Sequence, residues 1–195
     1  MKEEQYEKML QAKLSKKRYF HCICVAKKAV LLAERYKADI KKAKTAGLLH
    51  DIMKETAHKE QLEFLSECGI ELTDVEKHTE KLCHAISGAA YLKNVLKIDD
   101  EEILNAVRYH TTGRKNMSLL EKIIFVADFT SEDRDYEGVQ KIREAADYSL
   151  EAAMEAGFAF TLEDLARRGL PIHQDTLFAY NSLILSKGDG FRCYR

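Results

Sequence analysis

Residues 48–54 read LLHDIMK, so a histidine and an aspartate stand side by side at the end of an apolar run. A carboxylate in that position is costly to bury unless a partner compensates its charge. A helix end that reaches solvent would satisfy His50 and Asp51, and so would a bound metal ion. The dipeptide alone does not distinguish the two, and the rest of the chain has to supply the evidence.

The composition describes one domain with a hydrophobic core and little net charge. The chain has 195 residues, 46% of them hydrophobic and 32% charged, with a formal net charge of −1. This length and balance fit a single globular domain. A near-neutral chain is not expected to bind nucleic acid or an anionic membrane by broad electrostatic attraction. A local basic site for a phosphorylated small molecule is compatible with these numbers.

Nothing in the sequence points to export or to a membrane. The charged start MKEEQYEKML lacks the apolar segment of a secretory signal, and no run of about 18 apolar residues is present. The chain has five cysteines, of which Cys22 and Cys24 form C-x-C and the others stand apart. These spacings favour reduced, structural thiols, and we expect a cytoplasmic protein.

The apolar pattern predicts an all-α fold. Apolar residues recur at helical spacing along nearly the whole chain, which contains one proline and no tryptophan. Ser118 and Glu121 form a capping-box pattern before an apolar run. Helices are expected over 19–36, 39–52, 58–67, 82–96, from Asp99 or Asp100 to about 110, 118–128, 139–158, 162–168 and from a cap at Asp175 onward.

These helices are expected to form a single bundle of about 8–10 helices around one site. The predicted domain spans residues 1–186, and residues 187–195 are expected to be a flexible tail. Since loops between packed helices often carry functional residues, the loops 53–57, 111–117 and 129–138 are the candidates to line the site.

Six histidines and aspartates fall on or beside the inward faces of five predicted helices. His21 lies one turn before Val25, His84 opens a stretch of small residues, and His110 extends an apolar face that begins at Ile103. Separate buried polar groups would each need a partner, whereas one shared metal centre would satisfy all of them. The candidate metal ligands are His21, His50, Asp51, His84, His110 and Asp128.

The donor types indicate which metals and which chemistry fit. Imidazole and carboxylate suit iron, manganese, zinc and similar borderline or hard cations. Six ligands exceed what one ion with an open position needs, so two bridged ions fit better, and Asp51 is the natural bridge because it adjoins His50. Two such ions can lower the pKa of a water between them and clamp an in-line displacement at phosphorus. The pattern therefore favours hydrolysis of a phosphoester or phosphoanhydride.

The order His21, His50-Asp51, His84, His110, Asp128 resembles the HD-domain phosphohydrolase superfamily. Within it, five stretches resemble the YqeK-type symmetrical bis(5′-nucleosyl)-tetraphosphatases of bacteria, and the resemblance covers nearly all of residues 1–186. The stretches are RYFHCICVA (18–26), AGLLHDIMK (46–54), HAISGA (84–89), HTTGRKNMSLLEKIIFVADFTSEDR (110–134) and KIREAA (141–146).

This resemblance implies an all-α hydrolase that cleaves diadenosine tetraphosphate, and related dinucleoside tetraphosphates, symmetrically to two ADP molecules. It implies two divalent or trivalent metal ions, above all iron, with manganese, magnesium, cobalt or zinc as substitutes. Carried over by position, His21, His50, Asp51 and Asp128 would hold one ion, and His84, His110 and the bridging Asp51 the other. After Asp128 the chain reads FTSEDR, where the family more often has a tyrosine, an isoleucine, Glu-Pro and Asn before the arginine. Arg134 is retained, so the site is expected to be kept with a locally different loop.

The hypothesis for the reaction is attack on phosphorus by a hydroxide between the two metals. Lys54 and Arg134 would hold the phosphate chain and stabilise charge on the leaving nucleotide. Together with Asp51 they are the predicted catalytic residues. Arg18, one turn before His21, is a further candidate to bind phosphate.

The stretch that follows His110 is a candidate substrate-binding loop. Thr111, Thr112 and Gly113 could offer hydroxyls or a backbone N–H to phosphate or base. A simple helix end would explain the same three residues. His58, His78 and His173 lie in polar contexts and are expected to be ordinary hydrogen-bonded side chains.

Three other functions remain open from the residues alone. The first is an HD-type phosphohydrolase that acts on another nucleotide, such as a cyclic dinucleotide, (p)ppGpp or a deoxynucleoside triphosphate. The second is a nucleotide- or metal-binding regulator without turnover, and the third is a helical adaptor with incidental histidines. Leu177, Tyr180 and Leu183 on the final helix would also allow a homodimer.

Overall fold

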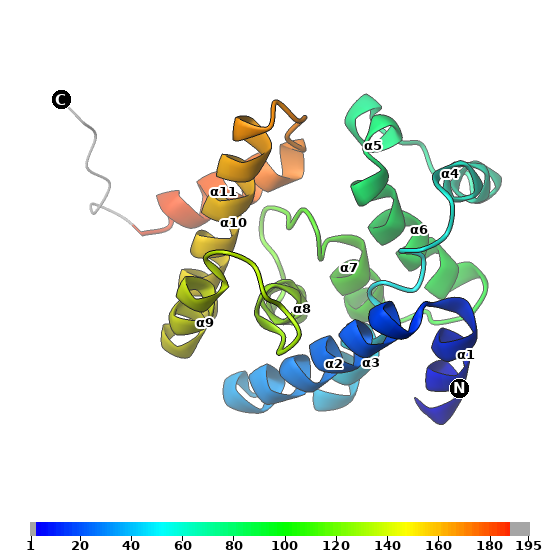
Figure 1. Cartoon of the computed structure of the whole chain (residues 1–195), viewed down its shortest axis with the longest axis horizontal. Coiled ribbons are helices and arrows are strands. Elements are labelled where there is room, and N and C mark those ends of the chain that lie inside the picture. Colours follow the sequence, from blue (N-terminus) through cyan, green and yellow to red (C-terminus); the bar gives the residue numbers. More distant parts are fainter. Residues whose placement is uncertain (1–2, 188–195) are drawn as a thin grey trace.

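Helices α2 (Lys16–Tyr36) and α3 (Ile40–Leu49) run side by side below the middle of an all-helical fold (Figure 1). The computed structural model describes residues 3–187, and over these residues it contains eleven helices and no β-strand. In Figure 1, α7 and α8 lie between α4–α6 on one side and α9–α11 on the other. The remaining helices are α1 (Glu3–Lys13), α4 (His58–Glu67), α5 (Asp74–His78), α6 (Glu80–Asn94), α7 (Glu101–Arg108), α8 (Leu119–Thr130), α9 (Val139–Tyr148), α10 (Leu150–Arg167) and α11 (Gln174–Leu185).

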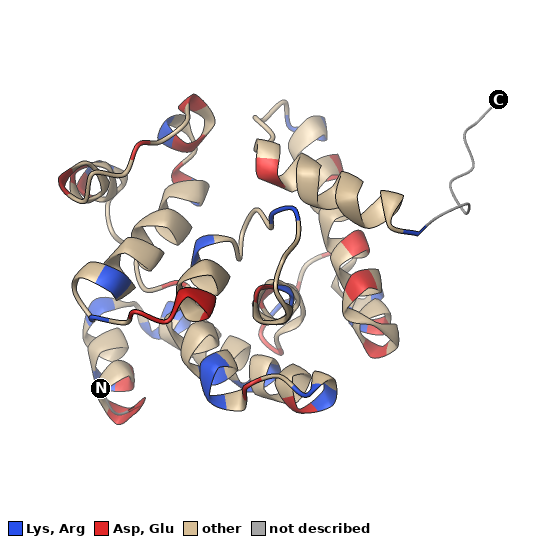
Figure 2. Cartoon of the chain, turned by 180° about the vertical axis from the view of Figure 1, so that it is seen from behind, with Lys and Arg blue, Asp and Glu red and all other residues tan. Residues whose placement is uncertain are grey.

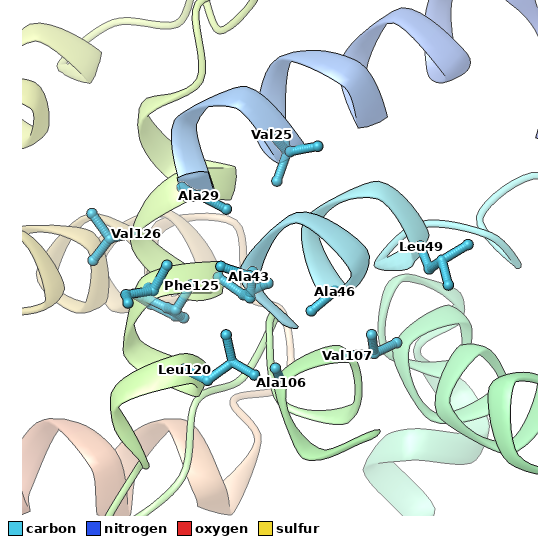
Figure 3. Packing of buried hydrophobic residues seen from close by; sticks show 14 of the residues in the cluster. Val25, Ala29, Ala43, Ala46, Leu49, Ala106, Val107, Leu120, Phe125 and Val126 are labelled. Carbon is cyan, nitrogen blue, oxygen red and sulfur yellow. The ribbon is translucent and has the colours of Figure 1, made fainter. Parts of the chain in front are cut away.

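The core is built where α2, α3, α7 and α8 meet, and small residues bring α2 and α3 unusually close. A Cβ atom on Gly47 would lie only 2.9 Å from the Cα atom of Ala26, so the position accepts no side chain. Burial of the apolar side chains from these helices is the main favourable contribution to folding. Figure 3 shows this cluster, with Val25, Ala29, Ala43, Ala46, Leu49, Ala106, Val107, Leu120, Phe125 and Val126 labelled.

Several predicted helix ends are confirmed, and local capping sets two of them. The helix over 58–67 has the predicted bounds, although its N-cap residue Ala57 makes no side-chain hydrogen bond. Asp100 caps α7 and accepts hydrogen bonds from the backbone N–H groups of Glu102 and Ile103. The Ser118 hydroxyl accepts from the Glu121 N–H, and the Glu121 carboxylate accepts from the Ser118 N–H, which completes the predicted capping box.

The prediction of a long helix over 139–158 followed by a short one over 162–168 is wrong. The chain breaks at Ser149, which has an extended backbone and whose hydroxyl accepts from the Ala152 N–H. Serine makes such caps well but carries no strong breaker signal in a sequence. No cap or breaker interrupts the chain after residue 158, so α10 continues to Arg167.

Two helices, α1 and α5, are absent from the sequence prediction, which raises the count above the expected range. α1 is largely charged and buries Tyr6 and Leu10, and α5 is a single turn capped by Thr73 and Glu76. The predicted cap of α11 is also corrected. His173 is the N-cap residue and accepts from the backbone N–H of Asp175, which lies inside the helix.

The remaining predictions concern the chain ends, the surface and the thiols. Among the described residues, no helix combines the length and apolar character needed to cross a membrane. Cys22, Cys24, Cys68 and Cys83 are free thiols. Tyr180 and Leu183 pack against the core, whereas Leu177 is 38% exposed. The predicted tail lies outside the described residues apart from Lys187.

Candidate metal centre

The structure brings all six predicted ligands together from five parts of the chain. His21 lies on α2, His84 on α6 and Asp128 on α8, whereas His50 with Asp51 directly follows α3 and His110 follows α7. The four histidines and Asp51 are buried, and the Asp128 side chain is 15% exposed. Their ligand atoms form three overlapping groups whose members lie within 4.8 Å of one another. Only the packed helices create this cluster, since residues 21 and 128 are far apart in sequence.

Asp51 lies between two pairs of imidazoles. Its Oδ2 atom is 3.8 Å from Nε2 of His21 and 3.5 Å from Nε2 of His50. Its Oδ1 atom is 3.1 Å from Nε2 of His84 and 3.6 Å from Nε2 of His110. Each carboxylate oxygen therefore faces a different pair, which is the arrangement a bridging carboxylate requires.

Asp128 completes the half of the cluster that contains His21 and His50. Its Oδ1 atom is 3.0 Å from Nε2 of His21 and 3.7 Å from Nε2 of His50. We call His21, His50, Asp51 and Asp128 the first half of the cluster, and His84, His110 and Asp51 the second half. The two halves adjoin, since His110 also lies within 4.8 Å of His50 and Asp128.

Backbone carbonyls orient two of the histidines. His50 donates from Nδ1 to the carbonyl of Gly47, and His110 donates from Nδ1 to the carbonyl of Val107, each at 2.7 Å. Because a carbonyl oxygen only accepts, the proton of the neutral ring sits on Nδ1 and the Nε2 lone pair stays free. Both bonds reach back three residues to the end of the preceding helix, so the helix ends themselves aim the rings.

The residues present fit a pair of divalent cations. Nε2 of His50 and Oδ1 of Asp51 are buried without a hydrogen-bond partner. Nε2 of His84 lies 3.0 Å from Nε2 of His110. Buried polar atoms without partners are costly and rare. Imidazole nitrogen and carboxylate oxygen are ligand types that cations of this class accept, and cations would satisfy all of these atoms.

The electrostatics favour the ligand forms of these groups. Burial opposes ionisation of Asp51, but its polar neighbours, the charged Lys54 among them, hold the pKa of its carboxyl well below the usual range. Burial likewise opposes ionisation of Asp128, and Arg134 more than offsets it, so this pKa is also well below the usual range. Burial, aided by the charge of Lys54, lowers the pKa of His84 to about 3. The carboxylates are therefore ionised and the His84 imidazole is neutral.

Three basic side chains form a rim over the cluster, and they are the three that the sequence proposed for phosphate. Nη1 of Arg18 donates to Oδ2 of Asp51 at 2.7 Å. Arg134 donates from Nε to the Asp128 carbonyl at 2.8 Å and from Nη2 to the Asp128 carboxylate. Nζ of Lys54 is 3.1 Å from Nε2 of His84. Arg18, Lys54 and Arg134 are 26%, 28% and 31% exposed, so this basic rim separates the cluster from solvent.

The loop after His110 uses most of its polar groups internally. The Thr112 hydroxyl donates to the carbonyl of Gly113, and the Gly113 N–H donates to the carbonyl of Tyr109, each at 2.8 Å. Gly113 has a positive φ of 63°, and a Cβ atom there would lie 2.6 Å from Phe158. These contacts favour the helix-end explanation for Thr112 and Gly113, whereas Thr111 is half-buried.

The histidines set aside from the cluster make structural contacts elsewhere. His58 lies 3.0 Å from the carbonyl of Lys77, and Nδ1 of His78 lies 2.8 Å from the carbonyl of Asp74. His173 caps α11. Each is occupied by local or surface hydrogen bonds.

Sequence reasoning missed Asp133. Its Oδ2 atom lies 2.8 Å from Nδ1 of His21, and the Ser131 hydroxyl donates to its Oδ1 at the same distance. Asp133 lies in the 129–138 loop, which the sequence named as a candidate site-lining segment. A loop has no periodicity, so no helical face marks which of its side chains points inward; its place directly before Arg134 was the only signal.

Comparisons with known proteins agree with this geometry. Residues 18–133 match the model of the HD domain family. The chain is 38% identical over 92% of its length to a Halalkalibacterium halodurans protein named bis(5′-nucleosyl)-tetraphosphatase, symmetrical, and covers 95% of it. A Bacillus subtilis protein of the same name is 35% identical, with 94% of this chain and 98% of that protein covered.

A solved structure shares the whole fold. It is a Clostridium acetobutylicum protein described as a "predicted HD superfamily hydrolase involved in NAD metabolism", with a TM-score of 0.92 and 39% identity. The match covers 95% of this chain and 98% of that one. The segment that matches the family model contains all six clustered histidines and aspartates as well as Asp133. The chain therefore belongs to the HD domain family.

Proposed function

We propose that this chain hydrolyses diadenosine tetraphosphate symmetrically to two ADP molecules. The observation that carries the proposal is the Asp51 carboxylate between two pairs of imidazoles, beneath a rim of three cationic side chains. The two relatives that match nearly the full length bear the name of this activity. Related dinucleoside tetraphosphates share the same polyphosphate and belong to the same substrate class.

The first half of the cluster would hold one metal ion and the second half another, with Asp51 shared between them. We propose iron as the native metal; manganese, cobalt, zinc or magnesium are the substitutes to test against it. When bound, the two cations would supply Lewis acidity that activates a water and neutralises phosphoryl oxygens. Elemental analysis of protein purified without oxygen, followed by iron-specific spectroscopy, tests the identity of the metal.

The basic rim would bind and orient the polyphosphate. Lys54 and Arg134 each lie against a ligand carboxylate or imidazole, so a phosphate placed over the cluster comes within reach of both. Arg18 occupies a third side. Charge-assisted hydrogen bonds from such groups are among the strongest available to a phosphate. They would stabilise the negative charge that builds on the departing ADP when the central P–O bond breaks.

The cluster and the basic rim would contact the phosphates of a substrate, so the same cluster could serve substrates that carry other groups on those phosphates. Cyclic dinucleotides, (p)ppGpp and deoxynucleoside triphosphates are therefore the competing substrates. A regulator that binds nucleotide without turnover is the competing non-enzymatic function. Neither has an observation in its favour comparable to the shared name of the full-length relatives.

Product analysis tests the proposal. Metal-replete protein is incubated with diadenosine tetraphosphate, and the products are separated by ion exchange. ADP as the sole product is expected. AMP together with ATP would mean asymmetric attack and would contradict the proposal, and absence of product would favour another nucleotide or a binding role.

We also propose that the protein acts in the cytoplasm on free nucleotides and not on nucleic acid. Acidic and basic residues are interspersed over the helices (Figure 2), which offers no support for a broad nucleic-acid surface. A homodimer through α11 stays a prediction. Sedimentation of the protein, alone and with a short duplex, tests the homodimer and the absence of nucleic-acid binding.

A further inference from the structure

His21 differs from His50 and His110 in the group that contacts Nδ1, the ring nitrogen that points away from the cluster. Nδ1 of His50 and of His110 faces a backbone carbonyl, whereas Nδ1 of His21 faces the carboxylate of Asp133 at 2.8 Å. The His21 side chain is 4% exposed and that of Asp133 is 18% exposed. The pair is thus largely shielded from water. Nδ1 of His21 donates to Asp133, and Nε2 on the other side of the ring faces the cluster, 3.0 Å from Oδ1 of Asp128 and 3.3 Å from Nη2 of Arg134.

Asp133 is itself held in place. The Ser131 hydroxyl donates to Oδ1 at 2.8 Å, which leaves Oδ2 for His21. Nη2 of Arg143, from α9, donates to the carbonyls of Ser131 and Arg134 at 2.8 and 2.9 Å. The backbone on both sides of Asp133 is therefore tied to a neighbouring helix. A carboxylate anchored in this way orients its partner and does not merely follow it.

We propose that Asp133 is a positioning residue for the first half of the cluster. It holds His21 so that Nε2 points at Asp128 and Asp51, at 3.0 and 3.8 Å, and its charge increases the basicity of that nitrogen toward a divalent cation. Asp133 does not lie among the grouped ligand atoms. The inference rests on the proposed function only in requiring that the cluster binds metal.

The proposal predicts a selective effect, because Asp133 contacts one half of the cluster. The contacts given for His84 and His110 are with other groups: the His84 ring lies against Nζ of Lys54, and Nδ1 of His110 faces the Val107 carbonyl. Loss of a carboxylate partner behind a metal-binding histidine typically weakens metal affinity about 10–100-fold. That loss is expected at one of the two metal equivalents, with the other nearly unchanged.

The test is a metal titration of metal-free protein with Co²⁺, followed by calorimetry and by the visible absorption of the bound ion. Asp133→Ala is expected to weaken one of two binding events about 10–100-fold and to change the spectrum of that ion. Asp133→Asn keeps an oxygen that accepts the same hydrogen bond but lacks the charge, so its loss is expected to be smaller. Glu132→Gln removes a charge from the exposed neighbouring position and is the matched control, expected to bind both ions as the wild type does.

The outcomes separate this inference from the proposed function. If the wild type binds two ions and Asp133→Ala binds both with unchanged affinity and spectrum, the inference is overturned while the proposed function stands. Equal weakening of both ions in Asp133→Ala together with a lowered melting temperature describes general loss of structure, and Asp133→Asn, which preserves shape, then decides. Weakening of one ion in that variant supports the inference, and equal weakening of both or of neither overturns it. A wild type that binds no Co²⁺ contradicts the proposed metal centre itself.

Discussion

The candidate ligand cluster and the C-terminal layer (residues 139–185, helices α9–α11) differ in whether their buried polar side-chain atoms have hydrogen-bond partners. In the C-terminal layer, the Ser149 hydroxyl caps α10 and the Thr161 hydroxyl donates to the Gly157 carbonyl. None of the buried side-chain nitrogens or oxygens in described residues 139–185 lacks a hydrogen-bond partner. In the cluster, Nε2 of His50 and Oδ1 of Asp51 do lack one.

This difference separates a region whose buried polar atoms are all paired from one in which some are not. The buried polar side-chain atoms of the C-terminal layer all have partners, within the layer or in the segments next to it, so folding alone accounts for them. The cluster leaves ligand-type atoms facing one another around Asp51, which folding alone would disfavour. We expect substitutions in the cluster to act on metal binding and turnover, and substitutions in the C-terminal layer to act on stability.

The largest expected effect is loss of turnover in Asp128→Ala. The substitution removes a candidate ligand 3.0 Å from Nε2 of His21 and also the anchor of Arg134. ADP release is expected to fall about a thousandfold or more, while far-UV circular dichroism keeps the helical signal. Asp164→Ala, which removes an exposed-surface ion-pair carboxylate from α10, is the matched control and should retain activity. Full activity in Asp128→Ala would contradict the assignment of metal binding and turnover to the cluster.

The second expected effect is stabilisation of the metal-free protein by a divalent cation. At a hundredfold excess over its dissociation constant, a ligand that binds only the native state adds about 2.7 kcal/mol. For a chain of this size that corresponds to roughly 5–10 °C in melting temperature, measured by differential scanning fluorimetry. The control is Asp51→Asn, which loses the carboxylate shared by both halves. An equal shift in this variant would show that the cation binds elsewhere.

The convergence of the candidate ligands could be predicted from the sequence in part because helical periodicity places some of them on inward faces. His110 continues the apolar face of α7 and Asp128 that of α8, so the inward direction of each was readable. Helix ends set by local capping, such as Ser118 with Glu121, were readable for the same reason.

What could not be predicted depends on contacts between distant segments. Asp133 lies on a loop, and only the packing of α2 against α8 brings it to His21. Ser149 is compatible with a helix interior, so the break between α9 and α10 left no clear sequence signal. The sequence could propose Arg18 and Lys54 for phosphate binding. The distances of their side chains to Asp51 and His84 follow from the folded structure alone.

Gly113 links the two regions, because it lies where the loop after His110 contacts Phe158 of the C-terminal layer. It shares its φ of 63° with Gly169, but a Cβ atom at 113 would lie 2.6 Å from Phe158, whereas nothing lies within 4 Å of one at 169. Gly169→Ala should cost about 1–2 kcal/mol for the left-handed backbone. Gly113→Ala should cost about 1–3 kcal/mol more because of overpacking.

Chemical denaturation of both glycine variants measures the difference. The pair isolates packing, since both positions carry the same backbone strain. Equal losses of stability would mean that Phe158 moves aside freely and that the cluster loop is not tightly joined to the C-terminal layer.

The smallest expected effect concerns Glu76, which joins α5 and α7 to the start of α11. Its Oε1 atom accepts from Nη2 of Arg108 at 2.7 Å and lies 3.4 Å from Nε2 of His173. Burial opposes its ionisation, but the Thr73 N–H and Arg108 hold its pKa below the ordinary 4.5. Glu76→Gln should therefore cost about 1 kcal/mol near neutral pH.

The sign of its pH dependence follows from the lowered pKa. The stabilisation by ionised Glu76 is fully present above pH 4.5 and is lost as the pH falls through the lower pKa of the folded state. The stability difference between wild type and Glu76→Gln, measured by urea unfolding from pH 7 down to pH 3, should shrink on acidification. The exposed Glu80→Gln at the start of α6 serves as the control and should show little difference at any pH. If the stability difference between wild type and Glu76→Gln stays constant or grows toward pH 3, the carboxylate charge does not hold α5 and α7 to the start of α11.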